Sequence, residues 1–120
     1  MLALCGCSDA TQPPAKFSQQ LSTADRLEVT NRYFAFGTTI TGVDVSSLTM
    51  AVKSAKKKTW GQPMDWGSPF VWDVEFYAGT NHLAGIPICY GIFKLEGVEY
   101  IDGTGVVEEF SKKLEKDRMR

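Results

Sequence analysis

Alternation of polar and apolar residues predicts several strands of the chain. Every second residue from Phe70 to Phe76 is large and apolar, and the residues between them are mostly polar. A two-residue period is typical of a half-buried β-strand, because successive side chains point to opposite faces. The segment 26–33 alternates in the same way, and the segment 38–41 is β-branched throughout, which also favours strands. We therefore expect three strands in these segments.

The pattern continues with more strands after residue 77. The segment 83–89 is mostly apolar, but it contains Pro87, which has no N–H to donate. We therefore expect this strand to lie at a sheet edge or to carry a bulge at the proline. Two short apolar segments flank Glu96-Gly97. They predict a hairpin over 92–101 with a two-residue turn, because glycine readily adopts the positive φ that such turns need.

Two stretches have the period of a helix instead. The first is predicted over 44–58, with Asp44 as its N-cap; its apolar stripe comprises Leu48, Ala51, Val52 and Ala55. The second is predicted over 104–118, with Thr104 as its N-cap; its stripe comprises Val106, Val107, Phe110 and Leu114. Lysines near the end of the first helix suit the negative end of its dipole. They are interpreted as a solvated helix end, with an anion-binding patch as the alternative: Lys53, Lys56, Lys57 and Lys58.

The predicted order is ββαββββα, which indicates an α+β fold. Tight turns between strands require antiparallel pairing. We therefore expect one antiparallel sheet of about five or six strands with two helices packed on one face, because this arrangement buries both apolar stripes. Residues 25–120 form this single domain. Residues 8–24 are polar and contain Pro13-Pro14, which predicts an extended tether.

Composition narrows the possible roles. The 120 residues carry a formal net charge of −1, so no overall positive field favours nucleic acid or an anionic membrane. No stretch has the roughly 20 apolar residues needed for a transmembrane helix. The cysteines at 5, 7 and 89 are odd in number, which argues against a disulfide framework. A single histidine excludes a multi-histidine metal site, and we predict no metal and no cofactor.

The first residues carry a motif of their own. Leu4-Cys5-Gly6-Cys7 resembles a bacterial lipobox, with an aliphatic residue three positions before the lipidated cysteine and a small residue directly before it. The resemblance is to small bacterial lipoproteins of unassigned role, and only a truncated leader precedes Cys7. It implies that residues 1–7 belong to a signal segment and that Cys7 carries the acyl chains.

This resemblance implies a place in the cell envelope. The chain would touch the membrane only through its lipid anchor, and Ser8 after the cysteine differs from the retention signal of the inner membrane, which favours the outer membrane facing the periplasm. Two alternatives stay open for Cys5 and Cys7. They are incidental residues of a frayed cytosolic N-terminus, or they form a metal or redox pair that His82 and Cys89 would have to complete.

Aromatic residues in loops are the best candidates for a binding surface, because they offer flat apolar area with few polar groups. They are Trp60, Met64 and Trp66 in a loop rich in proline and glycine, and Phe34 and Phe36 in the turn after the first strand. The alternative is that both loops fold back and cap the core.

The sequence gives only weak indications of a catalytic site. Asp73 and Glu75 share one face of a predicted strand, roughly 6.6 Å apart along the backbone, a spacing that overlaps the carboxyl pairs of glycoside hydrolases. A solvated strand face gives the same pattern. His82 and Cys89 lie on one strand and too far apart for a nucleophile and its base. Cys89 is interpreted as a small buried hydrophobe and His82 as an exposed turn residue.

These observations favour a non-catalytic binding or inhibitor module anchored in the envelope, with a protein or glycan partner and no nucleic acid. One alternative is a small hydrolase that uses Asp73 and Glu75. Another is a structural tethered domain, with subunits joined along the strand that holds Pro87. The oligomeric state stays open.

Overall fold

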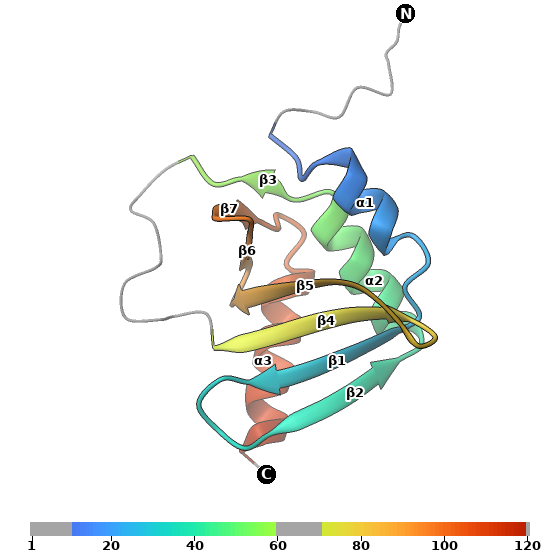
Figure 1. Ribbon diagram of the computed structural model, residues 1–120. Helices are drawn as coiled ribbons and strands as arrows, with labels where there is room; N and C mark the ends of the chain where they lie inside the picture. Colours follow the sequence, from blue (N-terminus) through green and yellow to red (C-terminus); the bar gives the residue numbers. More distant parts are fainter. Residues whose placement is uncertain (1–10, 60–70, 120) are drawn as a thin grey trace, which may run out of the picture.

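The computed structural model describes residues 11–59 and 71–119. This part of the chain forms three helices and seven strands, shown in Figure 1. In chain order they are α1 (Ala15–Leu21), β1 (Arg26–Asn31), β2 (Gly37–Thr41), α2 (Val43–Lys53), β3 (Lys56–Lys57), β4 (Trp72–Ala78), β5 (Asn81–Cys89), β6 (Ile92–Leu95), β7 (Val98–Ile101) and α3 (Val106–Arg118). The predicted α+β class is confirmed.

All seven strands belong to one antiparallel sheet with the order β2-β1-β4-β5-β6-β7-β3. Short turns connect β1 to β2, β4 to β5, β5 to β6 and β6 to β7, so neighbouring strands run in opposite directions. Two pairings join strands that are distant in sequence: β3 with β7, which aligns Lys56 with Ile101, and β1 with β4. The β1–β4 pairing aligns Arg26 with Tyr77. It places β1 in the interior of the sheet and leaves β2 at one edge and β3 at the other.

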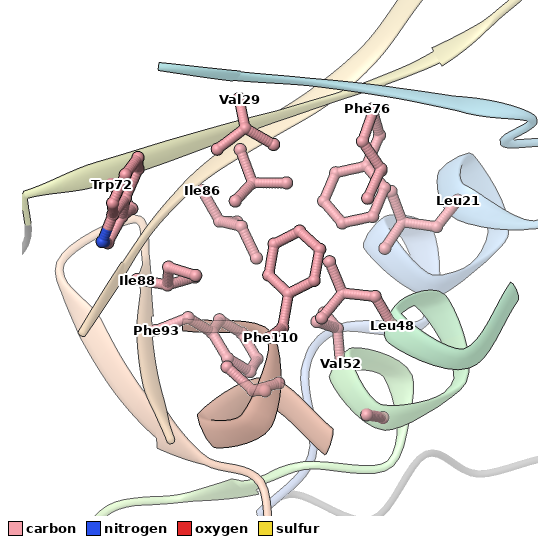
Figure 2. Packing of buried hydrophobic residues seen from close by; sticks show 14 of the residues in the cluster. Leu21, Val29, Leu48, Val52, Trp72, Phe76, Ile86, Ile88, Phe93 and Phe110 are labelled. Atoms are coloured by element: carbon pink, nitrogen blue, oxygen red, sulfur yellow. The ribbon is translucent and has the colours of Figure 1, made fainter. Parts of the chain in front are cut away.

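One face of the sheet carries the core. Alternate residues of β1, β4 and β5 point into it, and all three helices add side chains to the same cluster (Figure 2). Leu21 of α1, Leu48 and Val52 of α2 and Phe110 of α3 meet the strand residues there. Packing of helix stripes against one sheet face removes these side chains from water, which is the main stabilising term of such a layer.

The clearest sequence patterns agree with the structure. Trp72, Val74 and Phe76 of β4 are buried, whereas Asp73 and the residues that follow it at alternate positions are partly exposed. The β6–β7 hairpin turns at Glu96-Gly97, with φ values of 51° and 81°. Two successive positive φ angles match the right-handed twist of the flanking strands, as the sequence predicted.

The tether predicted for residues 8–24 is wrong over 15–21, where the structure has helix α1. Phe17 and Leu21 are buried in the core, and they lie four residues apart, so one helical turn brings both to the same face. Apart from Ala15, the remaining residues of α1 are polar, and they are mostly exposed. Two apolar anchors are enough here because the sheet and α2, rather than the helix itself, provide the rest of the buried surface.

The first long helix is shorter than the predicted 44–58. Helix α2 ends at Lys53, and Lys56 and Lys57 form strand β3 beside β7. Lys58 is not on a solvated helix end: its side chain is 5% exposed, and its ammonium lies 3.1 Å from the Glu99 carboxylate. Lys53 is in the last turn of the helix, whereas Lys56, Lys57 and Lys58 belong to a sheet edge that a buried ion pair holds.

The predicted N-caps also differ. Gly42 occupies the N-cap of α2, and Asp44 lies in the first turn without a capping hydrogen bond. The start of α3 is held by Asp102, whose carboxylate accepts the Val107 amide at 2.9 Å and the Thr104 hydroxyl at 2.6 Å. This buried carboxylate takes the role predicted for Thr104, because an acceptor facing the first-turn amides satisfies them from outside the helix.

The strand that holds Pro87 is not bulged at the proline and is interior in the strand order. Its segment before Ile88, however, pairs only with β4 among the described strands, so Pro87 lies at a local edge. Strand β5 pairs with β4 along its length, and its bulge lies opposite Phe76 and Tyr77. Its pairing with β6 starts only at Ile88. Pro87 is therefore the last residue before that pairing begins, a position where a missing N–H leaves the β5–β6 ladder intact.

Candidate functional site

A cavity of about 260 Å³ opens where the end of β4, the β5–β6 turn and α3 meet. We call it the Trp72 pocket. Its lining is mainly apolar: Val71, Trp72, Cys89, Tyr90, Ser111 and Glu115. Small-molecule sites usually span roughly 300–1,000 Å³. The Trp72 pocket lies just below this range, and its volume suits one large side chain of a partner.

The polar groups of the pocket are already paired. The Trp72 indole N–H donates to the Glu115 carboxylate at 3.1 Å. Arg118 donates to the same carboxylate at 2.9 Å, and its guanidinium lies 4.3 Å from the centre of the Phe34 ring. A planar guanidinium over a ring face is a favourable cation–π contact. The pocket thus presents apolar surface with its carboxylate neutralised, which favours an uncharged ligand.

Tyr90 stands at the mouth of the pocket in an unusual conformation. Its φ is 52° and its side chain is 63% exposed. A left-handed backbone costs a residue with a Cβ about 1–2 kcal/mol, and glycine would avoid this cost. The Ser111 hydroxyl donates to the Tyr90 carbonyl at 3.0 Å, so α3 holds the strained residue in place.

Cys89 does not act as a nucleophile in this pocket. Its side chain is buried, and burial, with the Glu99 charge nearby, raises the pKa of the thiol. A protonated thiol is a weak nucleophile and a weak metal ligand. The interpretation of Cys89 as a small buried hydrophobe is consistent with its place in the wall.

The predicted binding residues separate into three groups. Trp60, Met64 and Trp66 lie outside the described residues. Phe36 packs edge to face on Trp72, with ring centres 5.7 Å apart, so it caps the core as the alternative interpretation held. Phe34 is 55% exposed; it does not line the Trp72 pocket, and its ring contacts Arg118, the partner of the lining residue Glu115.

The residues of the hydrolase alternative lie on the open face of the sheet. Asp73 accepts a hydrogen bond from Arg32 at 2.9 Å, and Glu75 pairs with His82. Gly85 makes room for this, because any Cβ there would collide with the Glu75 carboxylate. Neither carboxylate lines one of the cavities found among the described residues. The two acids therefore lack a place where a substrate would be shielded from water.

His82 and Cys89 are at opposite ends of β5, and their side chains lie in different surroundings. His82 is on the open face, where its ring lies edge-on to Tyr77 with centres 5.2 Å apart, and Cys89 is in the pocket wall. Within residues 11–59 and 71–119, no three His, Cys, Asp or Glu side chains come together in a way that could hold a metal ion.

Two other cavities are larger but more polar. The largest, about 590 Å³, lies over the edge of β5 that β6 does not cover, between α1 and the β6–β7 turn. Lysine and glutamate both line it, including Lys16 and Glu96. The other, about 380 Å³, lies between the starts of α2 and α3. The largest also contains a strained residue, Glu96 with a φ of 51°, but neither cavity is lined by an exposed aromatic ring, so the Trp72 pocket is the stronger candidate.

Sequence reasoning missed this pocket because its walls come from three distant segments. The position of Trp72 on the apolar face of a predicted strand favours the core, and Tyr90 falls between two predicted strands. The one local signal is Tyr90-Gly91 between apolar strands, which indicates a two-residue turn but not the left-handed φ of the tyrosine.

No protein-family model, no curated protein sequence and no solved structure matches this chain. Within the described residues, no helix has the length and apolar character needed to cross a membrane. The functional argument therefore rests on the residues and geometry of the chain itself.

Proposed function

We propose that this chain is a small non-catalytic binding module whose Trp72 pocket receives an apolar or aromatic side chain of a protein partner. The single observation that carries the proposal is Tyr90, an exposed ring held in a strained backbone conformation at the mouth of an apolar cavity. Backbone strain of this kind is retained where the surrounding structure enforces it, and such residues cluster at functional sites.

Two further features support a binding role over a catalytic one. The thiol in the wall is held protonated by burial, and the carboxylate is bonded to both Trp72 and Arg118. The pocket thus presents neither a thiolate nor an unpaired carboxylate to a ligand. Tyrosine and tryptophan, in contrast, supply large contact areas with little conformational entropy to lose, and both are enriched where partners bind tightly.

The module is proposed to act in the bacterial cell envelope, held by acyl chains on Cys7. This part rests on the lipobox-like residues Leu4 to Cys7 and on no structural feature. Mass spectrometry of the membrane fraction of cells that express the complete gene tests it. Acylated Cys7 supports the anchor, and an unmodified N-terminus overturns it without affecting the pocket.

The pocket is tested by titrating the isotopically labelled chain with indole and p-cresol, which mimic tryptophan and tyrosine side chains. We expect saturable NMR shifts of the backbone amides of Trp72, Tyr90 and Ser111, with a Kd on the order of millimolar for such small probes. The Tyr90→Gly variant should bind about threefold to tenfold more weakly, because it removes one aromatic contact.

Glu96→Gly is a matched control, because Glu96 has nearly the same left-handed φ, 51° against 52°, in the neighbouring hairpin turn. Both glycine variants relieve strain, so both should keep or raise the free energy of unfolding by up to about 1 kcal/mol. Only Tyr90→Gly should weaken probe binding. Equal binding by the two variants, or shifts with N-acetylglucosamine instead of the aromatic probes, overturns the proposal.

A further inference from the structure

Strand β2 is an edge strand of the described sheet, and it has neither of two common protective features, charge and proline. It spans Gly37–Thr41, it is the first strand in the sheet order, and it carries no charged residue and no proline. Figure 1 shows it along the lower border of the sheet. Soluble proteins usually block such edges with charge, proline, a bulge or a covering segment, because an open edge is a template for pairing with another chain.

The hydrogen-bonding pattern shows which backbone groups face outward. The Asn31 amide donates to the Phe36 carbonyl at 3.1 Å, and the pairing then continues with Val29 opposite Thr38 and Leu27 opposite Ile40. Hydrogen-bonded and non-bonded pairs alternate in an antiparallel ladder. Thr38 and Ile40 therefore direct their N–H and C=O groups at β1. The outward-facing residues are Gly37, Thr39 and Thr41.

The outward backbone groups of β2 can pair with those of β2 in a second copy of the chain. A two-fold axis through Thr39 pairs Thr39 with its own copy and Gly37 with Thr41, so the outward N–H and C=O groups of both strands find partners. On the helix side, half-buried Ile40 then lies opposite Thr38 of the other copy. The backbone positions of the two Glu28 residues are three strand spacings or about 14 Å apart, and each Glu28 carboxylate lies 2.9 Å from Arg26 of its own copy, which offsets its charge.

Exposed apolar side chains flank both ends of the strand. Phe34 precedes it and is 55% exposed, and Val43 follows it and is 77% exposed. Both lie outside the strand itself, Phe34 in the β1–β2 turn and Val43 at the start of α2. They add exposed apolar surface at the two ends of the open edge.

We propose that two copies of this chain associate through antiparallel pairing of β2 about Thr39, which joins their sheets into one continuous sheet. The interface consists of main-chain hydrogen bonds along Gly37–Thr41. It is distinct from the Trp72 pocket and does not depend on the proposed binding function.

The test is sedimentation equilibrium of the full chain, kept reduced so that Cys5 and Cys7 form no disulfides. Thr39→Pro removes the outward N–H at the axis and leaves the β1 ladder intact. Thr39→Lys places two ammonium groups across the axis while each lies beside the Glu28 of its own copy. Thr39→Val is the matched control, because it loses the hydroxyl bond to Glu28 but keeps the N–H and the β-branched shape.

We expect a concentration-dependent dimer for the unmodified chain and for Thr39→Val. Thr39→Pro and Thr39→Lys should raise the dimer Kd by at least about tenfold, since each removes or opposes the central contacts. Hydrogen exchange should show that the Thr39 and Thr41 amides gain protection as the protein concentration rises. A chain that stays monomeric up to millimolar concentration, or a dimer that Thr39→Pro leaves unchanged, overturns the proposal.

Discussion

The two edges of the sheet are built in opposite ways. At one edge β3 has only two residues, Lys56 and Lys57. The Lys57 amide, which faces away from β7, donates to the Thr11 carbonyl of the same chain. At the other edge β2 has five residues, none charged, and its outward amides face away from every described strand. One edge is closed by its own chain, and the other is open for another chain.

The difference shows that a lysine run has a structural role here. Lys58 places a nearly buried ammonium against Glu99 of β7, so the closed edge is fixed by an ion pair as well as by ladder bonds. Breaking a buried pair costs much more than removing an exposed one. The closed edge should therefore respond strongly to substitution of its charge, whereas the open edge should respond mainly through association.

The largest effect is expected at the closed edge. Lys58→Met leaves the Glu99 carboxylate in place without this ammonium and should lower the free energy of unfolding by about 3–5 kcal/mol. Chemical denaturation monitored by circular dichroism measures this. The double variant Lys58→Met with Glu99→Leu should recover most of the loss, because neither charge of this pair then stays buried. A single variant within 1 kcal/mol of the unmodified chain would contradict the buried ion pair.

An intermediate effect separates two neighbours in the open strand. Thr38→Pro removes an N–H that donates to β1 and should cost about 1–3 kcal/mol of unfolding free energy. Thr39→Pro removes an outward N–H and should cost less than about 1 kcal/mol when measured on dilute, monomeric protein. Thermal unfolding of both variants decides this. Equal losses would contradict the assignment of inward and outward N–H groups along β2.

The smallest effect on stability is expected when the open edge is given a lysine like those of the closed edge. Thr41→Lys makes the open edge resemble the closed one and should change unfolding free energy by less than about 0.5 kcal/mol, while it lowers aggregation on heating. Light scattering during a temperature ramp measures the aggregation. Thr30→Lys, on the same open face but inside the sheet, controls for added charge. It should leave aggregation higher than Thr41→Lys does.

The elements that the sequence predicted well are those whose signal is local. The alternation of β4 and the Glu96-Gly97 turn depend on a few neighbouring residues, and both are found as expected. Helix α1 was missed because Phe17 and Leu21 form only one helical step among polar residues. Strand β3 was missed because Lys56 and Lys57 favour a helix by composition, and only their distant partner β7 makes them a strand.

The candidate site was much harder to predict. Trp72, Tyr90 and Glu115 are far apart in sequence, and nothing in the pattern shows that β4, the β5–β6 turn and α3 meet. The turn phenylalanines were partly informative. Phe34 stays exposed and contacts Arg118 beside the pocket, but Phe36 packs on the buried Trp72. Side-chain type alone does not distinguish an exposed turn residue from one that caps the core.

The pairing of β1 with β4 has a consequence for how the chain acquires its structure. The inner neighbour of β1 starts at Trp72, more than forty residues after β1 ends. Contacts of this sequence separation close late and slow the folding of small domains. A growing chain that has not yet reached Ala78 would therefore hold an incomplete sheet with both sides of its first hairpin unpaired. The domain is expected to mature only after nearly its whole length has been synthesised, and a fragment that ends before β4 should stay unfolded.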